Sequence, residues 1–145
     1  MAPHFRNCQY YGVDGSREML RIGESRISPD SLTLCDFSSE RLPFEDGFFD
    51  FALCMQVLRH MNVAHQPHIL SELARVVNGA VFIHDIFYEG DRHIYDAGEL
   101  GGQLFINNTW ALSVFLADVA KCFPGREIRQ RGFIGPSFGL EILRS

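Results

Sequence analysis

The sequence has little positive charge and almost no lysine. Of its 13 basic residues only Lys121 is a lysine, and the 18 acidic residues bring the formal net charge to −5. Nucleic acid and anionic membrane surfaces attract basic proteins. Neither is therefore the expected partner of this chain.

The four cysteines stand far apart, without a CxxC pair or any spacing typical of a metal site. We therefore predict no metal centre. Cys35 and Cys54 lie within apolar runs, where a buried free thiol is the simplest interpretation.

The chain also lacks an apolar run long enough to cross a bilayer, and its first residues lack the apolar core of a secretion signal. Together these absences predict a reducing, cytoplasmic setting.

What the sequence does contain is an alternation of strand-like and helix-like segments. Runs rich in aromatic and β-branched residues predict strands over 8–13, 31–35, 50–57, 79–87, 127–133 and 138–143. Apolar residues at helical spacing predict a helix that starts near Ser16 and helices over 64–77 and 109–123. This order is typical of one α/β domain, residues 1–145, with a mostly parallel sheet that ends in an antiparallel β-hairpin.

Three successive stretches resemble consecutive motifs of the class I S-adenosylmethionine-dependent methyltransferases. They read YYGVDGSREML, LCDFSSERLPFEDGFFDFALCMQVLRHM and HILSELARVVNGAVFIHDIF. The resemblance is closest to the small-molecule branch with the ubiquinone and menaquinone methyltransferases. It covers residues 9–87, and beyond them it is architectural. Each motif alone is weak, but their joint order is specific. The resemblance implies a Rossmann-like fold, S-adenosylmethionine as methyl donor and a small-molecule acceptor.

The resemblance also assigns residues to the ribose of the donor. Asp14 ends a predicted strand, at the edge of the sheet where ligands bind in open α/β folds. It is implied to accept hydrogen bonds from both ribose hydroxyls, with Gly15 and Ser16 beside it. An aspartate that only caps the helix starting near Ser16 is the alternative.

The adenine ring is implied to lie near the next strand end. By resemblance the Asp36 carboxylate accepts from the adenine amino group, and the backbone N–H of Phe37 donates to the ring. One acceptor beside one donor complements the edge of adenine. Met19 would pack on the face of the ring, although an ordinary core position on an apolar helix face is equally open.

The stretch CMQVLRHM is implied to lie beneath the methionine end of the donor. Backbone carbonyls near Cys54 and Met55 would contact its ammonium group. His60 is the candidate catalytic residue, because a histidine that can take up a proton near neutral pH could orient or deprotonate a substrate hydroxyl. A histidine that caps backbone groups is the alternative. Family members often have two histidines, or Glu-His, where this chain has Arg59-His60.

The segment from Tyr88 to Asn108 is polar and rich in glycine. The resemblance places a substrate-covering insertion there. Tyr95, Phe105 and Trp110 are candidates for an aromatic pocket, and the Gly101-Gly102 pair is a candidate hinge for a moving lid. A core role for the aromatic side chains is equally compatible with the sequence.

The family's first strand and glycine-rich loop should precede the motif that carries Asp14, yet residues 1–8 contain no glycine. We therefore expect a domain truncated by one βα unit at its N-terminus. In the family that strand lies between the strands predicted over 8–13 and 50–57, and its absence would leave backbone groups unpaired. Direct pairing of the two strands is one solution. A homodimer that exchanges a segment is the other, and it is the one we expect.

Three functions are compatible with these observations. Methyl transfer to a small molecule is the favoured one. A methyltransferase-like module without catalysis, acting in assembly or as a partner subunit, is the alternative. A nicotinamide-dependent Rossmann enzyme is the third, supported only by Asp14.

Overall fold

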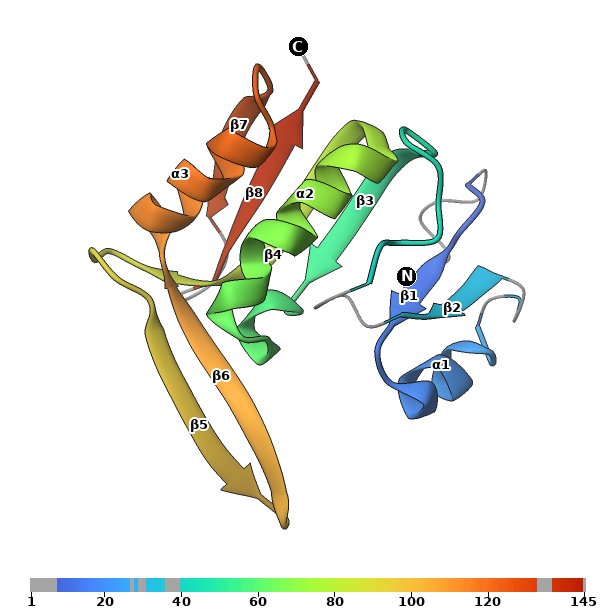
Figure 1. Ribbon diagram of the computed structural model, residues 1–145, viewed down its shortest axis with the longest axis horizontal. Coiled ribbons are helices and arrows are strands. Elements are labelled where there is room, and N and C mark those ends of the chain that lie inside the picture. The colour runs from blue at the N-terminus through green and yellow to red at the C-terminus, as the bar shows by residue number, and fades with distance from the viewer. Residues whose placement is uncertain (1–7, 27, 29–30, 36–39, 133–136, 145) are drawn as a thin grey trace. The chain divides into compact units, whose positions relative to one another are not determined.

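The computed structural model describes residues 8–26, 28, 31–35, 40–132 and 137–144 (Figure 1). The chain divides into two units, Met1–Leu42 and Pro43–Ser145, and each is described by itself. Both units contain helices and parallel strand pairs. The α/β class predicted from the sequence is confirmed.

The first unit is a β-α-β element. Strands β1 (Gly12–Asp14) and β2 (Leu32–Leu34) pair in parallel, with Asp14 opposite Leu34. Helix α1 (Arg17–Gly23) connects them. The Ser16 hydroxyl accepts from the backbone N–H of Met19 at 3.4 Å, the usual role of an N-cap serine. Both strands are shorter than the sequence predicts.

The second unit contains a six-stranded sheet in the order β5-β6-β4-β8-β7, with β3 also paired to β4. Strand β3 (Phe49–Met55) runs parallel to the central strand β4 (Val77–Tyr88). Strands β7 (Glu127–Gly132) and β8 (Ser137–Leu143) form an antiparallel hairpin that joins β4 through β8. The predicted C-terminal hairpin is therefore confirmed.

Two helices, α2 (Gln66–Val76) and α3 (Leu112–Cys122), pack beside each other in the second unit (Figure 1). The core contains fully buried side chains of both helices and of the central strands: Leu70, Val76, Phe115, Val119, Val81, Ile83, Leu140 and Ile142. Burial of each such side chain contributes about 1.5–3 kcal/mol. Within the described part of the chain, none of the helices is both long enough and apolar enough for a membrane span.

A second hairpin gives the polar, glycine-rich stretch of residues 88–108 a regular structure that the sequence did not predict. Strands β5 (Ile94–Leu100) and β6 (Gln103–Ala111) pair antiparallel, with residues 94–100 opposite residues 103–109 (Figure 1). Gly101 and Gly102 have φ of 60° and 80° and form its two-residue turn, a conformation that favours glycine. Because β6 continues to Ala111, the helix predicted from residue 109 begins only at Leu112.

Candidate functional site

In the first unit, Asp14 stands at the carboxyl end of β1. Its Oδ1 accepts from the backbone N–H of Ser16 at 2.8 Å, and its own carbonyl accepts from the N–H of Cys35 at 3.1 Å. Within the described ranges, Oδ2 accepts no hydrogen bond from the protein. The carboxylate therefore caps the turn before α1 and still keeps one oxygen for a ligand hydroxyl.

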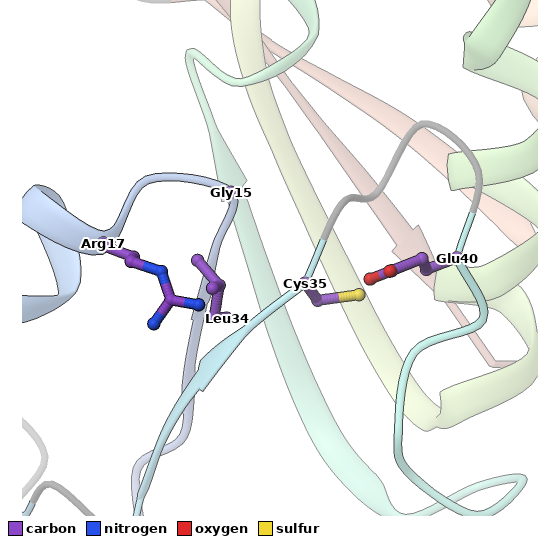
Figure 2. A pocket seen from close by; sticks show the side chains of 5 residues that line it. All are labelled: Gly15, Arg17, Leu34, Cys35 and Glu40. Atoms are coloured by element: carbon purple, nitrogen blue, oxygen red, sulfur yellow. The ribbon is translucent and has the colours of Figure 1, made fainter.

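An open hollow of about 440 Å³ lies in this unit, lined by Gly15, Arg17, Leu34, Cys35 and Glu40 (Figure 2). Figure 2 shows the Cys35 thiol and the Glu40 carboxylate directed toward each other. The lining combines one cation, one anion and apolar surface, and the volume is within the range of small-ligand sites. The hollow lies directly beside Asp14 in the chain, since Gly15 lines it.

The structure describes some, but not all, of the other residues of this unit that were predicted to bind the methyl donor. Ser16 is the N-cap of α1, and Gly15 lines the hollow. The Met19 side chain is 54% exposed and so is not a core residue of its helix. This exposure leaves the contact with adenine as the prediction for Met19. Asp36 and Phe37 lie outside the described residues, and their assignments stay predictions.

In the second unit, β3 and β4 end at the same edge of the sheet, with Met55 opposite His84. The Cys54 side chain is buried at this edge, and burial, aided by the charge of Asp85, raises the pKa of its thiol to about 12. A protonated, buried thiol offers no charge to a ligand, so only the backbone of Cys54 can serve one. The Met55 side chain is nearly half exposed.

Asp85 lies buried in β4. Its Oδ2 accepts from the backbone N–H of Arg59 at 3.2 Å, and its Oδ1 accepts from the N–H of Ile86 at 2.9 Å. Burial raises the pKa of the Asp85 carboxyl, and the two amides oppose that shift. Arg59 belongs to the 3₁₀ helix η3 (Leu58–His60), so the carboxylate holds this short helix at the end of the sheet.

His60, the candidate catalytic residue, is the last residue of η3 and is exposed. Its Nδ1 lies 3.1 Å from the carbonyl oxygen of Ile106 in β6. The Arg59 guanidinium donates from Nε and Nη2 to Asn107 Oδ1 at 2.9 and 2.6 Å. Asn108 Nδ2 donates to the carbonyls of Arg59, at 3.3 Å, and of Met61. Strand β6 thus contacts η3 through three consecutive residues.

Sequence reasoning missed Asn107 and Asn108. Both lie in a stretch read as an insertion, and no pattern of residues along the chain marks an asparagine that contacts a helix nearly fifty positions away. The two asparagines lie on a strand because residues 94–100 pair with residues 103–109, and the sequence analysis did not predict this pairing.

The three aromatic candidates divide into two groups. Trp110 is fully buried, with ring centroids 4.6 Å from His93 and 6.0 Å from Phe115. It is therefore a core residue. Tyr95 and Phe105 are exposed on the β5–β6 hairpin and remain available to a ligand.

Comparison with known proteins adds a family and a set of relatives. Residues 1–83 match the family model described as a methyltransferase domain. The demethylmenaquinone methyltransferase of Anoxybacillus flavithermus is 26% identical over 148 residues, and that of a Geobacillus species is 28% identical over 147 residues. Each alignment covers 87% of this chain and 60% of the relative. The chain thus spans about 60% of the length of these curated relatives.

Solved structures show the same fold. The PH0226 protein of Pyrococcus horikoshii superimposes with a TM-score of 0.73 at 16% identity, over 97% of this chain and 73% of that one. A SAM-dependent methyltransferase of Methanosarcina mazei gives 0.69 at 18% identity, over 92% and 81%. A putative methyltransferase of Haloferax volcanii, solved in complex with the Trm112 methyltransferase activator, gives 0.64 at 14% identity, over 92% and 70%. The Rossmann-like architecture predicted from the sequence is thereby confirmed.

Proposed function

The chain belongs to the methyltransferase domain family, and from that membership we propose that it transfers a methyl group from S-adenosylmethionine to a small-molecule acceptor. We treat residues 1–145 as one methyltransferase-like domain. The observation that carries the proposal is the state of Asp14. Its carboxylate is fixed at the end of β1 by one amide and retains one oxygen for a ligand.

Each end of the donor has its own set of residues in this proposal. Asp14, with Gly15 and Ser16, binds the ribose hydroxyls. Met19, Asp36 and Phe37 hold the adenine. Cys54 and Met55 offer backbone carbonyls to the ammonium group of the methionine end. S-adenosylmethionine supplies a methyl group on a positively charged sulfur, which makes that carbon ready for attack.

His60 acts on the acceptor as a general base. The imidazole takes the proton of an acceptor hydroxyl, and the oxygen that remains makes an adjacent ring carbon of a quinol-type acceptor nucleophilic. That carbon forms the bond to the methyl group and then releases its own proton, while the electron pair of the broken carbon–sulfur bond remains on sulfur. Because this is an in-line displacement, positioning of the two reactants is the main demand on the protein. A base adds to the rate only when the acceptor starts protonated. His60 is exposed and can return the proton to solvent.

The names of the curated relatives favour a quinone as acceptor, since both are demethylmenaquinone methyltransferases. The exposed rings of Tyr95 and Phe105 offer aromatic surface suited to such a molecule. A demethylated quinol is therefore the first acceptor to assay.

Calorimetric titration with S-adenosylhomocysteine tests the donor site without knowledge of the acceptor. The wild-type chain should bind. Asp14→Ala should weaken binding by about 1.5–3 kcal/mol, because it removes a charged hydrogen-bond acceptor. Glu24→Ala, which changes an exposed carboxylate at the other end of α1, is the matched control and should bind like the wild type. Equal affinities of the wild type and Asp14→Ala would remove Asp14 from the donor site.

A non-catalytic role as a partner subunit is the second candidate. A putative methyltransferase of the same fold, from Haloferax volcanii, was solved together with an activator, so a partner subunit is compatible with this fold. This candidate predicts no binding of S-adenosylhomocysteine in the titration above. Binding of S-adenosylhomocysteine together with methylation of a quinol would exclude the non-catalytic role.

We also propose that the chain forms a homodimer. Strand β3 supports this proposal, because within the described residues it pairs with β4 alone and exposes Phe51, Leu53 and Met55 on one face. Apolar side chains on an edge strand favour association with a further chain. Light scattering at micromolar concentration should give twice the mass of the chain, and a strictly monomeric species would refute the dimer.

A further inference from the structure

Asn108 makes its contacts on both sides of His60 in the chain. Its Nδ2 donates to the carbonyl of Arg59, at 3.3 Å, and to the carbonyl of Met61, the residues directly before and after His60. The carbonyl of Ile106, two residues earlier on β6, lies 3.1 Å from the His60 imidazole. A single strand thus holds both the backbone around His60 and one nitrogen of its ring.

Burial of the Asn108 side chain destabilises the fold. Asn108 is fully buried, and among the described residues its Oδ1 accepts no hydrogen bond. A rotated amide would bring this oxygen against the two carbonyls, so the donor side must face Arg59 and Met61. A buried acceptor without a partner destabilises the folded state. An apolar side chain of similar size would avoid that cost, which indicates that the two donated bonds serve more than packing.

The contact with Ile106 also defines the tautomer of His60. A carbonyl oxygen can only accept a hydrogen bond, so Nδ1 must carry the proton. In the neutral ring Nε2 then holds the lone pair. The arrangement leaves the basic nitrogen of the exposed imidazole on the side away from β6.

We propose that Asn108 is a positioning residue that holds His60 in the Nδ1–H tautomer, with Nε2 as the nitrogen that accepts the proton of the methyl acceptor. The role of Nε2 rests on the proposed function. The tautomer and its dependence on Asn108 do not. Asp85 in β4, the strand that pairs with β6, also contacts η3 through the N–H of Arg59, so two neighbouring strands hold the short helix.

Long-range ¹H–¹⁵N correlation spectra of the imidazole rings test this directly. The spectra are recorded at a pH high enough to keep every ring neutral, and the His60 signals are assigned by their loss in His60→Gln. The wild type should show His60 mainly as the Nδ1–H tautomer. In Asn108→Leu, the backbone around His60 loses its two bonds to the Asn108 side chain, and the ring should lose its hydrogen bond to Ile106. The ratio of the Nδ1–H to the Nε2–H form should then fall on the order of fivefold, as expected for the loss of that one bond of the ring.

Asn107→Ala is the matched control, one residue earlier on the same strand. It removes the partner of the Arg59 guanidinium but leaves both backbone bonds of Asn108 in place. The His60 ratio should therefore stay within about twofold of the wild type, well under the effect of a lost hydrogen bond. Asn108→Asp, which keeps the shape and lacks the donors, replaces Asn108→Leu if the leucine variant does not fold.

The tautomer spectra and the activity assay test two separate hypotheses, so either hypothesis can be refuted without the other. A wild-type His60 in the Nε2–H form, or equal ratios in the wild type and the Asn108 variants, overturns the proposal whatever the activity. A fall of the same size in Asn107→Ala also overturns it, because the effect would then belong to the strand as a whole. If the tautomer behaves as expected but no quinol is methylated, the proposed function fails alone. Where methylation is seen, Asn108→Leu should lower kcat on the order of tenfold, a part of the usual effect of a general base, and leave the KM for the donor unchanged.

Discussion

The imidazole of His93 accepts a hydrogen bond at Nδ1 from the backbone N–H of Ala111, with 3.0 Å between the nitrogens. His93 directly precedes β5, and Ala111 is the N-cap residue before α3. The bond therefore joins the foot of the β5–β6 hairpin to the start of the helix. It requires an Nδ1 without a proton, because the amide is the donor.

Acid should weaken this junction. Burial lowers the pKa of His93 below its ordinary value, and the charge of Asp118 opposes the shift. Since the folded state favours the neutral ring, its stabilising effect is complete above the pKa of the unfolded chain and is lost as pH falls through the lower pKa of the folded state. Protonation also breaks the bond to Ala111, worth about 0.5–1.5 kcal/mol.

Thermal denaturation of the wild type and His93→Phe, measured across the mildly acidic range, checks this expectation. The phenyl ring keeps the contact with Trp110 and can neither titrate nor accept the bond. At neutral pH the variant should be the less stable protein, and the difference should shrink as the pH falls. A difference that is the same at every pH would show that the titration of His93 does not affect the junction.

Arg75 attaches the loop before β3 to helix α2. Its guanidinium donates to the Phe44 carbonyl at 2.7 Å, to Asp46 at 2.9 Å and in two bonds to Glu72 at 2.8 and 2.6 Å. The side chain is only 15% exposed. Arg75→Lys keeps the charge but loses the planar fork, so it should cost about 1–3 kcal/mol of unfolding free energy in urea.

An exposed arginine provides the control for this measurement. Arg21 forms two hydrogen bonds with Glu18, but both side chains are about two-thirds exposed. Such surface pairs contribute little, so Arg21→Lys should change the stability by less than about 0.5 kcal/mol. If both substitutions cost the same, burial of the Arg75 contacts would not be the source of their strength.

The sequence was most informative where each strand has a buried face. Residues 79–87 read as a strand because β4 alternates buried side chains, such as Val81, Ile83 and Phe87, along the centre of a sheet. The β5–β6 hairpin was missed for the opposite reason. Along β5, side chains on both faces are exposed, Ile94 on one and Tyr95 on the other, so no apolar alternation marks the strand.

The candidate site also has one part that could be predicted from the sequence and one part that could not. Asp14 could be predicted because its position depends only on the end of its own strand and the turn that follows. The contacts of His60 could not, because Ile106 and Asn108 reach it through the pairing of distant strands. A local pattern thus specifies where a functional group stands in its element, and tertiary pairing determines which groups surround it.

Gly79 should prove essential to the junction of β3 and β4. The register between these strands shifts between Phe49 and Phe51, and a Cβ added to Gly79 would overlap the backbone carbonyl oxygen of Asp50. A backbone atom cannot move aside as the tip of a flexible side chain can, so the strands themselves would have to separate. Gly79→Ala should therefore lower the unfolding free energy by about 1–3 kcal/mol, the usual cost of overpacking. A Cβ at Gly132 in β7 meets no atom of the described residues within 4 Å. Gly132→Ala is therefore the matched control, expected to change the stability by less than about 0.5 kcal/mol. Chemical denaturation of the three proteins decides the matter, and a Gly79→Ala variant as stable as Gly132→Ala would show that the two strands tolerate the extra methyl group.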